Sequence, residues 1–304
     1  MSGKPSSQAN GQSTRIAGIF QALLVTFLWS TSWVIIKFGL ADIPALPFAG
    51  LRYFIAFLCL LPFAFTRKSS AAWKKLAGRE WVLLGILGLI YYALTQGTQF
   101  LSLSYLPAMT ASLILNFTTS IVALSGIALL AERPSPLQWI GVIINLGGIL
   151  IYFFPVDLPS QQVIGVAIAI VGVIANAGSS LLGRYINRME TISPLQVTIV
   201  SMGIGSALLL IAGVITQGFP ELSLTNWMAI LWLAVVNTAI AFTLWNRTMR
   251  VLSAMESSII NSTMLIQIAV LAWIFLGERV NWQEGIGMAL AAAGVMIVQI
   301  RKKS

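Results

Sequence analysis

Long apolar stretches alternate with short polar breaks along almost the whole chain. Each stretch is about twenty residues long, which is what an α-helix needs to cross a hydrocarbon core ~30 Å thick. Charged residues, proline, glycine or asparagine mark the breaks, and we expect helices near 16–38, 47–65, 81–102, 107–130, 137–154, 163–185, 194–216, 227–247, 254–276 and 283–300. The pattern therefore predicts an all-α integral membrane fold of ten transmembrane helices.

Composition and charge agree with this interpretation. Hydrophobic residues make up 58% of the 304 residues and charged residues only 9%. The net charge of +9 comes from basic residues that sit in short loops and form no continuous stripe, so nucleic acid is not an expected partner. The positive-inside rule then predicts that both termini are cytoplasmic.

An internal repeat predicts the architecture. An offset of 146 residues aligns Trp81 with Trp227, Met109 with Met255 and Gly148 with Gly294, and it also aligns two Glu-Arg pairs, at 132–133 and 278–279. Each half would hold five helices, an odd number, so the second half must be inverted across the membrane. We expect a flexible cytoplasmic tail over 1–14, repeats over 15–155 and 161–300, and a basic cytoplasmic tail over 301–304.

Several kinds of chemistry have no candidate residues in this chain. There is no histidine and only one cysteine, Cys59, which we expect to serve packing alone, so a His/Cys metal site, a disulfide and a Cys/His nucleophile are excluded. Paired carboxylates within spans, a nucleophile with its base and a phosphate-binding loop are not visible either. We expect no catalytic residue, no cofactor and no metal.

The order of several motifs resembles the drug/metabolite transporter superfamily, specifically its ten-helix EamA type. These motifs are Leu-Trp-Ser-Thr-Ser-Trp at 28–33 followed by Lys37, Pro47 followed by Arg52, and the Leu-x-Glu-Arg sequences at 130–133 and 276–279. The resemblance covers nearly everything from 16 to 300 and implies a transporter, not an enzyme. Family members often have a proline in the middle of helices 4 and 9, but here Asn116-Phe117 and Met264-Leu265 stand in those regions, so that hinge does not carry over.

Polar and aromatic side chains within spans tend to face protein or water, and their positions predict a substrate path. In the first helix they recur on one face at helical spacing. The candidates for the path are Trp29, Ser32, Trp33, Tyr92, Gln96, Gln99, Asn116, Asn176, Ser179, Trp245 and Asn261. Such an aromatic, amide-rich and largely uncharged lining suits a zwitterion or a small amphiphile.

Two basic residues inside the predicted spans, Lys37 and Arg52, have competing interpretations. They could contact a substrate carboxylate or phosphate, or they could extend to the membrane surface, since Arg52 lies only about 7–8 Å into its helix at 1.5 Å per residue. For the Glu-Arg pairs, an ion pair that stabilises a turn is the expected role.

The functional hypothesis is an exporter or facilitator of small metabolites, amino acids or related amphiphilic compounds, working by alternating access through a central cavity. One alternative is a carrier of anionic metabolites that uses Lys37 and Arg52. A different class of function, a membrane sensor or scaffold, stays open. The expected location is the inner membrane of a bacterium, the expected partners are a small-molecule substrate and the lipid bilayer, and the expected state is a monomer.

Overall fold

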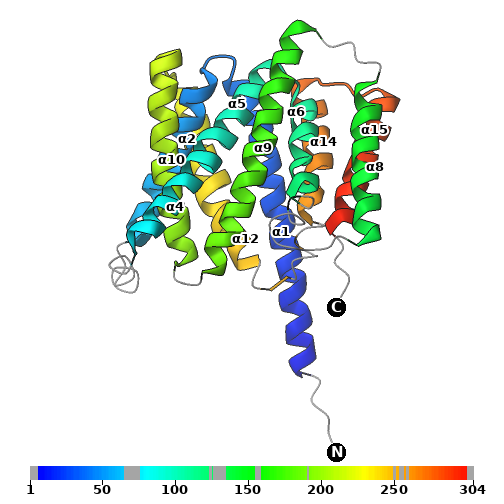
Figure 1. Ribbon diagram of the computed structural model, residues 1–304, viewed down its shortest axis with the longest axis horizontal. Coiled ribbons are helices and arrows are strands. Elements are labelled where there is room, and N and C mark those ends of the chain that lie inside the picture. The colour runs from blue at the N-terminus through cyan, green and yellow to red at the C-terminus, as the bar shows by residue number, and fades with distance from the viewer. Residues whose placement is uncertain are drawn as a thin grey trace, which may run out of the picture.

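A computed structural model of the chain describes residues 6–64, 76–122, 125, 135–154, 159–189, 192–248, 251–252, 257 and 260–299 (Figure 1). These residues form helices and turns, with no strand among them. The first half contains α1 (Ser6–Gly39), α2 (Ala45–Ala64), α4 (Gly78–Gly88), η1 (Leu89–Thr95), α5 (Gln96–Tyr105), α6 (Ala108–Asn116) and α8 (Pro136–Phe153). The second half contains α9 (Ser160–Arg188), α10 (Pro194–Gln217), α11 (Leu224–Ala234), η2 (Val235–Ile240), α12 (Ala241–Thr248), α14 (Met264–Leu276) and α15 (Trp282–Gln299).

The helices have the length and composition of membrane spans. Within the described residues, seven helices are long and apolar enough to cross a membrane, and three shorter apolar helices cover 108–122, 260–276 and 282–298. Many large apolar side chains on the outside of the bundle are exposed, among them Phe20, Leu150 and Trp273, as expected for a surface solvated by lipid. The protein is a multi-pass membrane protein, and the full set of ten crossings stays a prediction.

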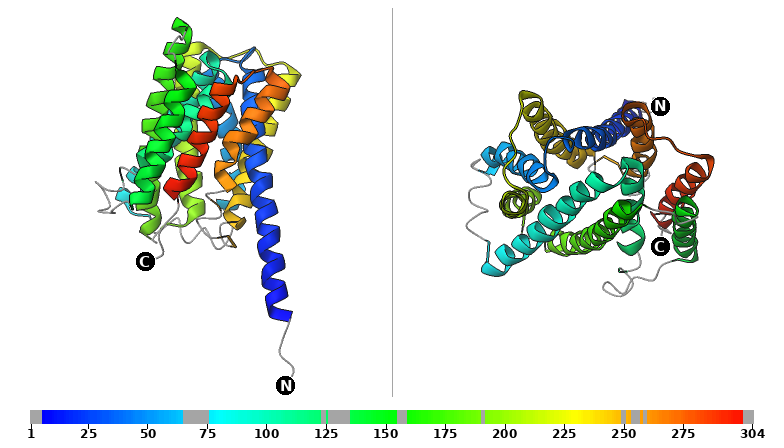
Figure 2. Two further views of the ribbon diagram at one scale, coloured as in Figure 1. Left: turned by 90° about the vertical axis from the view of Figure 1, so that its right-hand side faces the viewer. Right: turned by 90° about the horizontal axis from the view of Figure 1, so that it is seen from above.

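The ends of the described chain bear on the predicted tails. Helix α1 begins at Ser6, inside the segment 1–14 for which we expected a flexible tail, and it extends well beyond the bundle (Figures 1 and 2). Residues 1–5 and the predicted basic tail 301–304 lie outside the described residues. The start of α1 and the end of α15 are on the same side of the bundle.

The contacts between the two halves are symmetric. Helix α2 packs against α10 and α8 against α15, while α5 pairs with α9 as α1 pairs with α12. Seen from above, α8 and α15 form a separate pair at one end of the bundle (Figure 2). In Figure 1, α1 rises from the side of the N-terminus, and α9, which opens the second half, descends toward it. These directions are those that an inverted repeat requires.

Irregular turns also recur at equivalent positions. A π-helical segment begins at Leu89 in the first half and at Val235 in the second, which are 146 residues apart. Single-residue breaks occur at Phe117 and Thr263, again at that offset, where the backbone N–H of each donates to the carbonyl three residues earlier. No proline stands at either place, yet both helices are interrupted in the region where family members often have one.

Glycines bring α8 and α15 into backbone contact. A Cβ atom on Gly148 would lie 2.5 Å from the amide N of Ala291, and one on Gly287 would lie 2.7 Å from the carbonyl O of Gly148. Gly141 and Gly294 are equally close to the opposite backbone. These glycines therefore serve the close packing of the two helices.

Glu278 has a role that differs from the expected ion pair with Arg279. Its carboxylate oxygens accept hydrogen bonds from the backbone N–H groups of Ala108, at 2.6 Å, and Met109, at 3.0 Å. An anion at a helix N-terminus satisfies otherwise unpaired N–H groups and interacts favourably with the helix dipole. The turn after α14 is thereby attached to the start of α6. The equivalent pair, Glu132 and Arg133, lies outside the described residues.

Candidate substrate-binding site

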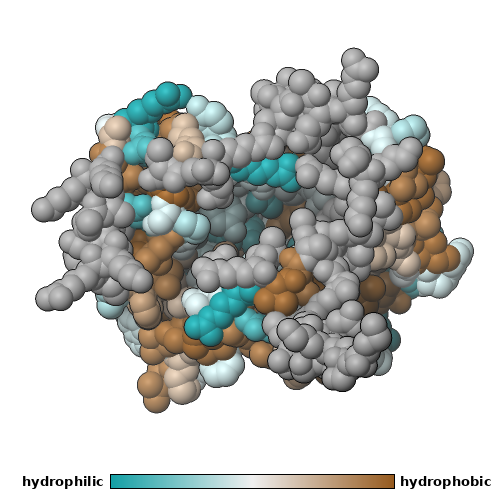
Figure 3. All heavy atoms as spheres, turned by 90° about the horizontal axis from the view of Figure 1, so that it is seen from below, coloured by the Kyte–Doolittle hydropathy of each residue, from teal (hydrophilic) through white to brown (hydrophobic). Residues whose placement is uncertain are grey.

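The face of the molecule on the side of the N-terminus is hollowed at its centre, and polar atoms are visible in the hollow (Figure 3). Among the sequence candidates, five side chains are half-buried: Trp29, Gln99, Asn116, Asn176 and Trp245. Their partial exposure in the interior of an otherwise lipid-facing bundle is typical of a water-accessible path.

Arg52 is the most unusual side chain in the interior. It is 5% exposed, which does not agree with the alternative in which it extends to the membrane surface. Its Nε donates to Thr238 Oγ1 at 3.2 Å and its Nη2 to Ser32 Oγ at 3.5 Å. The guanidinium also lies over the rings of Tyr53 and Phe100, at 5.0 and 5.9 Å from their centroids.

The direction of Arg52 follows from the packing of α2. A Cβ atom on Gly50 would lie 2.6 Å from Cα of Leu210, so this part of α2 is pressed against α10. Arg52 instead reaches Ser32 on α1 and Thr238 on η2. Helix packing thus fixes the rotation of α2 and directs the cation inward.

Aromatic side chains and one amide continue the cluster. The Tyr53 hydroxyl donates to Gln96 Oε1 at 2.6 Å. The ring of Tyr92 makes edge contacts with those of Tyr53 and Tyr91, at centroid distances of 5.6 and 4.8 Å. Tyr92 and Gln96, both sequence candidates, therefore contact Tyr53, whose ring lies under the cation, and each is largely buried.

Asn237 on η2 completes the polar network. Its Nδ2 donates to Ser32 Oγ at 2.8 Å, to Thr31 Oγ1 at 3.1 Å and to the carbonyl of Leu28. The side chain is fully buried. Ser32 therefore bonds to both Arg52 and Asn237, and it connects α1, α2 and η2.

Lys37 belongs to a different part of the structure. Its ammonium donates to the carbonyls of Leu103, at 2.6 Å, and Leu106, at 2.7 Å, in the last turn of α5. A cation is favourable at a helix C-terminus, where carbonyls lack intrahelical partners. Lys37 and Arg52 bind different partners on different elements, so the arrangement gives no support to a joint anion clamp.

The remaining candidates fall into two groups. Trp29 contacts Trp245 and Phe242, with centroids 5.2 and 5.4 Å apart, and this aromatic cluster joins α1 to α12. Asn176 Nδ2 donates to Thr118 Oγ1 at 3.4 Å, and the backbone carbonyl of Asn176 accepts a hydrogen bond from Ser179 Oγ. The contacts of Trp29 with Trp245 and of Asn176 with Thr118 lie at interfaces between the two halves.

Four candidates contribute less to the cluster. Trp33 is 8% exposed and packs in the main apolar core. Asn261 is exposed, outside the Arg52 cluster. Gln99 and Asn116 have side chains without a hydrogen-bond partner in the described part of the chain, which leaves their amides free for water or a ligand.

Sequence reasoning did not select Tyr53 and Asn237. A signal for Asn237 was present, since an asparagine in the middle of an apolar span is costly and tends to be functional. Tyr53 gave a weaker signal, as a tyrosine next to Arg52.

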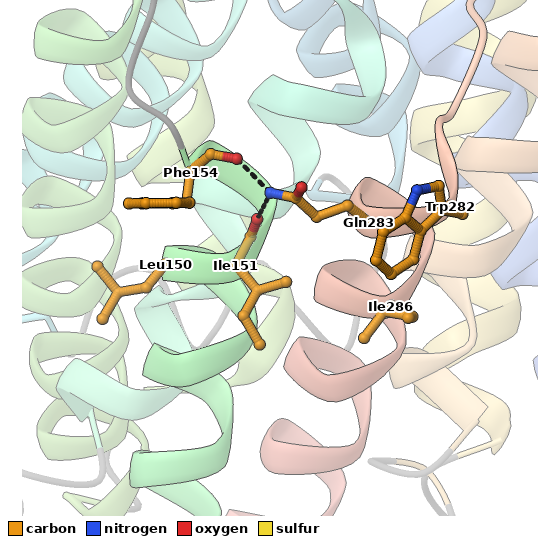
Figure 4. Close-up of a pocket in the computed structure, with 6 residues that line it drawn as sticks. All are labelled: Leu150, Ile151, Phe154, Trp282, Gln283 and Ile286. Atoms are coloured by element: carbon orange, nitrogen blue, oxygen red, sulfur yellow. Dashed lines mark hydrogen bonds between the residues drawn. The ribbon is translucent and has the colours of Figure 1, made fainter.

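Two surface pockets lie elsewhere and are almost entirely apolar. One is between the ends of α8 and α15 (Figure 4), where Gln283 Nε2 donates to the carbonyls of Ile151 and Phe154. It is lined by Leu150, Ile151, Phe154, Trp282, Gln283 and Ile286. The other is lined by Phe57, Leu61, Ala64, Trp81, Ile199, Val200, Gly203 and Ile204. Neither contains a charged side chain.

Comparison with known proteins agrees with the arrangement of the helices. A solved crystal structure superimposes with a TM-score of 0.66 and 18% identity, over 93% of this chain and 97% of the other, which shows a shared fold. A protein of Archaeoglobus fulgidus described as an uncharacterized transporter is 26% identical over 92% of this chain and 96% of its own length.

Two further relatives have more specific descriptions. A probable amino-acid metabolite efflux pump of Salmonella typhimurium is 25% identical, over 91% of this chain and 93% of its own length. An S-adenosylmethionine/S-adenosylhomocysteine transporter of Chlamydia trachomatis is 23% identical, over 93% of this chain and 88% of its own length.

The EamA-like transporter family matches the chain twice, once over residues 16–154 and again over 163–300. Together these matches cover most of the sequence, and each spans five of the expected helices. With the helical membrane fold and relatives that are described as transporters, they establish that the chain belongs to the EamA-like transporter family of the drug/metabolite transporter superfamily.

Proposed function

We propose that the protein moves amino acids or related amphiphilic metabolites that carry a carboxylate across the membrane, as an exporter or facilitator, by alternating access. The observation that carries this proposal is Arg52, a buried cation whose polar partners in the described structure are the neutral hydroxyls of Ser32 and Thr238. No carboxylate of the described residues lies within 4 Å of it.

The buried Arg52 cation carries a desolvation cost. A charge buried within a membrane span is costly, and the remaining cost falls when an anion binds beside it. Two hydroxyl acceptors and two aromatic faces hold the guanidinium in place but leave its charge uncompensated. The planar N–H donors of a guanidinium can bind a carboxylate in bidentate geometry. A substrate carboxylate is the partner that this environment favours.

The rest of the path supports an amphiphilic substrate. Aromatic rings from Trp29, Phe242 and Trp245 lie beside half-buried amides, which suits a molecule with one apolar and one polar end. The descriptions of two relatives, an amino-acid metabolite efflux pump and an S-adenosylmethionine transporter, also concern molecules with an amino-acid group.

The mechanism that we propose uses the two halves as rocking units around a central site. The hollow opens on the side where α1 begins. Arg79 and Tyr185, whose side chains bond at 2.9 Å, place the start of α4 and the end of α9 together on that side. By the positive-inside rule we assign this side to the cytoplasm of a bacterial cell, so the conformation is inward-facing.

Proton coupling is not part of the proposal. The acidic residues that the structure describes, namely Asp42, Glu80, Glu221, Glu278 and Glu284, lie at helix ends and in turns. Glu256, near the start of the ninth expected helix, lies outside the described residues. We therefore expect exchange that does not require a pH gradient.

Counterflow in proteoliposomes tests the proposal. Purified protein is reconstituted and exposed to labelled neutral amino acids, sugars, phosphorylated metabolites and quaternary amines, with and without a pH gradient. Exchange of neutral amino acids without a gradient is the expected result. Exchange confined to sugars or quaternary amines would refute the proposal, and a strict requirement for the gradient would refute its uncoupled mechanism.

A further inference from the structure

The side-chain oxygen of Asn237 is a buried acceptor without a donor. Asn237 is 0% exposed, and its Oδ1 has no hydrogen-bond partner in the described structure. Two other buried polar atoms, Gln196 Nε2 and Ser257 Oγ, are also unpaired, but neither residue bonds to the partners of Arg52. An unpaired polar group in a membrane interior is destabilising and therefore needs an explanation.

The orientation of the Asn237 amide is fixed by its neighbours. A backbone carbonyl only accepts hydrogen bonds, so the contact with the carbonyl of Leu28 must be made by Nδ2. Nδ2 also lies 2.8 Å from Ser32 Oγ. Exchanging the two ends of the amide would place Oδ1 against the Leu28 oxygen. The acceptor is thus held in place with its lone pairs unused.

Arg52 and Asn237 offer opposite polarities on either side of one hydroxyl. Ser32 Oγ donates to the carbonyl of Leu28 at 3.3 Å and accepts from Nη2 of Arg52 and from Nδ2 of Asn237. Its hydrogen-bonding capacity is therefore fully used. Beyond it, Arg52 has an excess of donors and positive charge, whereas Asn237 has a free acceptor. A ligand that carries an anionic and a cationic group close together has the complementary pattern.

The π-helical segment η2 positions Asn237 for this arrangement. In η2 the backbone bonds span one residue more than in an α-helix, and such turns are frequent at functional sites. The wider turn allows the adjacent residues Asn237 and Thr238 both to reach the cluster, one bonding to α1 and the other to Arg52 of α2.

We propose that Asn237 Oδ1 accepts a hydrogen bond from the α-ammonium group of an amino acid whose carboxylate binds Arg52. Asn237 is then a specificity-determining residue that selects zwitterionic α-amino acids over simple carboxylic acids. This inference rests on the proposed function, because it uses the same site and extends it to a second group of the substrate.

The first test uses the wild-type protein and three ligands. For the amino acid that exchanges fastest in the panel, the deaminated acid and the decarboxylated amine are tested as competitors; for phenylalanine these are 3-phenylpropionate and 2-phenylethylamine. We expect each analogue to compete at least ~10-fold more weakly, since hydrogen bonds to charged groups are worth about that factor or more. Equal competition by 3-phenylpropionate would overturn the role of Asn237 alone. Equal competition by 2-phenylethylamine would instead overturn the carboxylate role of Arg52.

The second test uses Asn237→Leu with Asn145→Leu as the matched control. Asn145 is equally buried, but both ends of its amide are bonded, with Oδ1 accepting from Ser120 and Nδ2 donating to the Ala291 carbonyl between α8 and α15. In Asn237→Leu, the competition constant for phenylalanine should rise ~10-fold or more while that for 3-phenylpropionate stays the same. In Asn145→Leu, the ratio of the two should equal that of the wild type. An unchanged ratio in Asn237→Leu would overturn the proposal, and if this variant does not fold the wild-type comparison still decides.

Discussion

Two cations that look alike in the sequence have different roles in the structure. Lys37 and Arg52 both lie within predicted spans near the same side of the membrane, and both were candidates for anion binding. Lys37 bonds to two carbonyls at the end of α5, whereas Arg52 bonds to side-chain hydroxyls in the interior. Lys37 therefore belongs to the framework, and Arg52 to the proposed binding site.

Replacing Lys37 by methionine should lower stability without changing substrate recognition. The substitution keeps most of the apolar stem and removes the two hydrogen bonds to Leu103 and Leu106. Hydrogen bonds to a charged group contribute about 1.5–3 kcal/mol, so the free energy of unfolding should fall by roughly that amount. Thermal unfolding in detergent measures the loss, and counterflow should give a KM within about twofold of the wild type. A large rise in KM at unchanged stability would return Lys37 to the substrate path.

Part of the candidate site could be predicted from the sequence, and the reason for the rest is geometric. Helical spacing is enough to place Trp29 and Ser32 on the face of α1 that looks into the bundle, because that helix is regular there. It is not enough for Asn237, because the period of 3.6 residues fails within η2. It also fails to orient Arg52, because the rotation of α2 depends on its contact with α10 at Gly50.

At the level of helices, irregular turns are distributed with the symmetry of the repeat. The third and eighth expected spans contain π turns, and the fourth and ninth contain breaks at Phe117 and Thr263. No proline stands in the latter pair, and each helix is interrupted where a backbone N–H donates to the carbonyl three residues earlier. The side chain of Gln267, which lies near one break, bonds to Ser30 and Thr26 on α1 and so joins α14 to α1 next to the break. These four positions are where the helices can bend if the halves move.

The contact between α8 and α15 depends on glycine, and a substitution there should be severe. Gly148→Ala places a Cβ atom 2.5 Å from the Ala291 amide N and 2.6 Å from the Gly287 carbonyl O. Both neighbours are backbone atoms, so the helices must separate, at a cost of about 1–3 kcal/mol. We expect a lower unfolding temperature in detergent.

Gly147 supplies the control on the same helix. A Cβ atom there meets nothing within 4 Å. Gly147→Ala should therefore leave the unfolding temperature unchanged or raise it slightly, because alanine favours helix. Equal destabilisation by the two alanines would show that α8 and α15 do not pack through Gly148.

At the scale of the whole molecule, aligned tryptophans, glycines and Glu-Arg pairs predict two inverted five-helix halves. The described helices make contacts between the halves that have the symmetry of such a repeat, and the division into two halves of five helices stays a prediction. The sequence could not indicate which face is hollowed, because that depends on the conformation of the chain. Nor are the halves equivalent at the site. Before residue 81 the offset of the repeat becomes 147 residues, because of one inserted loop residue, so Arg52 and Tyr53 align with Ile199 and Val200 and only one half contributes the cation.

This asymmetry makes Arg52 the position at which the proposed function is most directly tested. Counterflow of the amino acid that exchanges fastest is measured for the wild type, for Arg52→Lys and for Arg52→Gln, with folding checked by size-exclusion chromatography. Arg52→Lys retains the charge but loses the planar donors, and should raise KM ~10-fold or more; Arg52→Gln should abolish exchange. Exchange by folded Arg52→Lys and Arg52→Gln with the KM of the wild type would contradict the proposal that a buried arginine binds the substrate carboxylate.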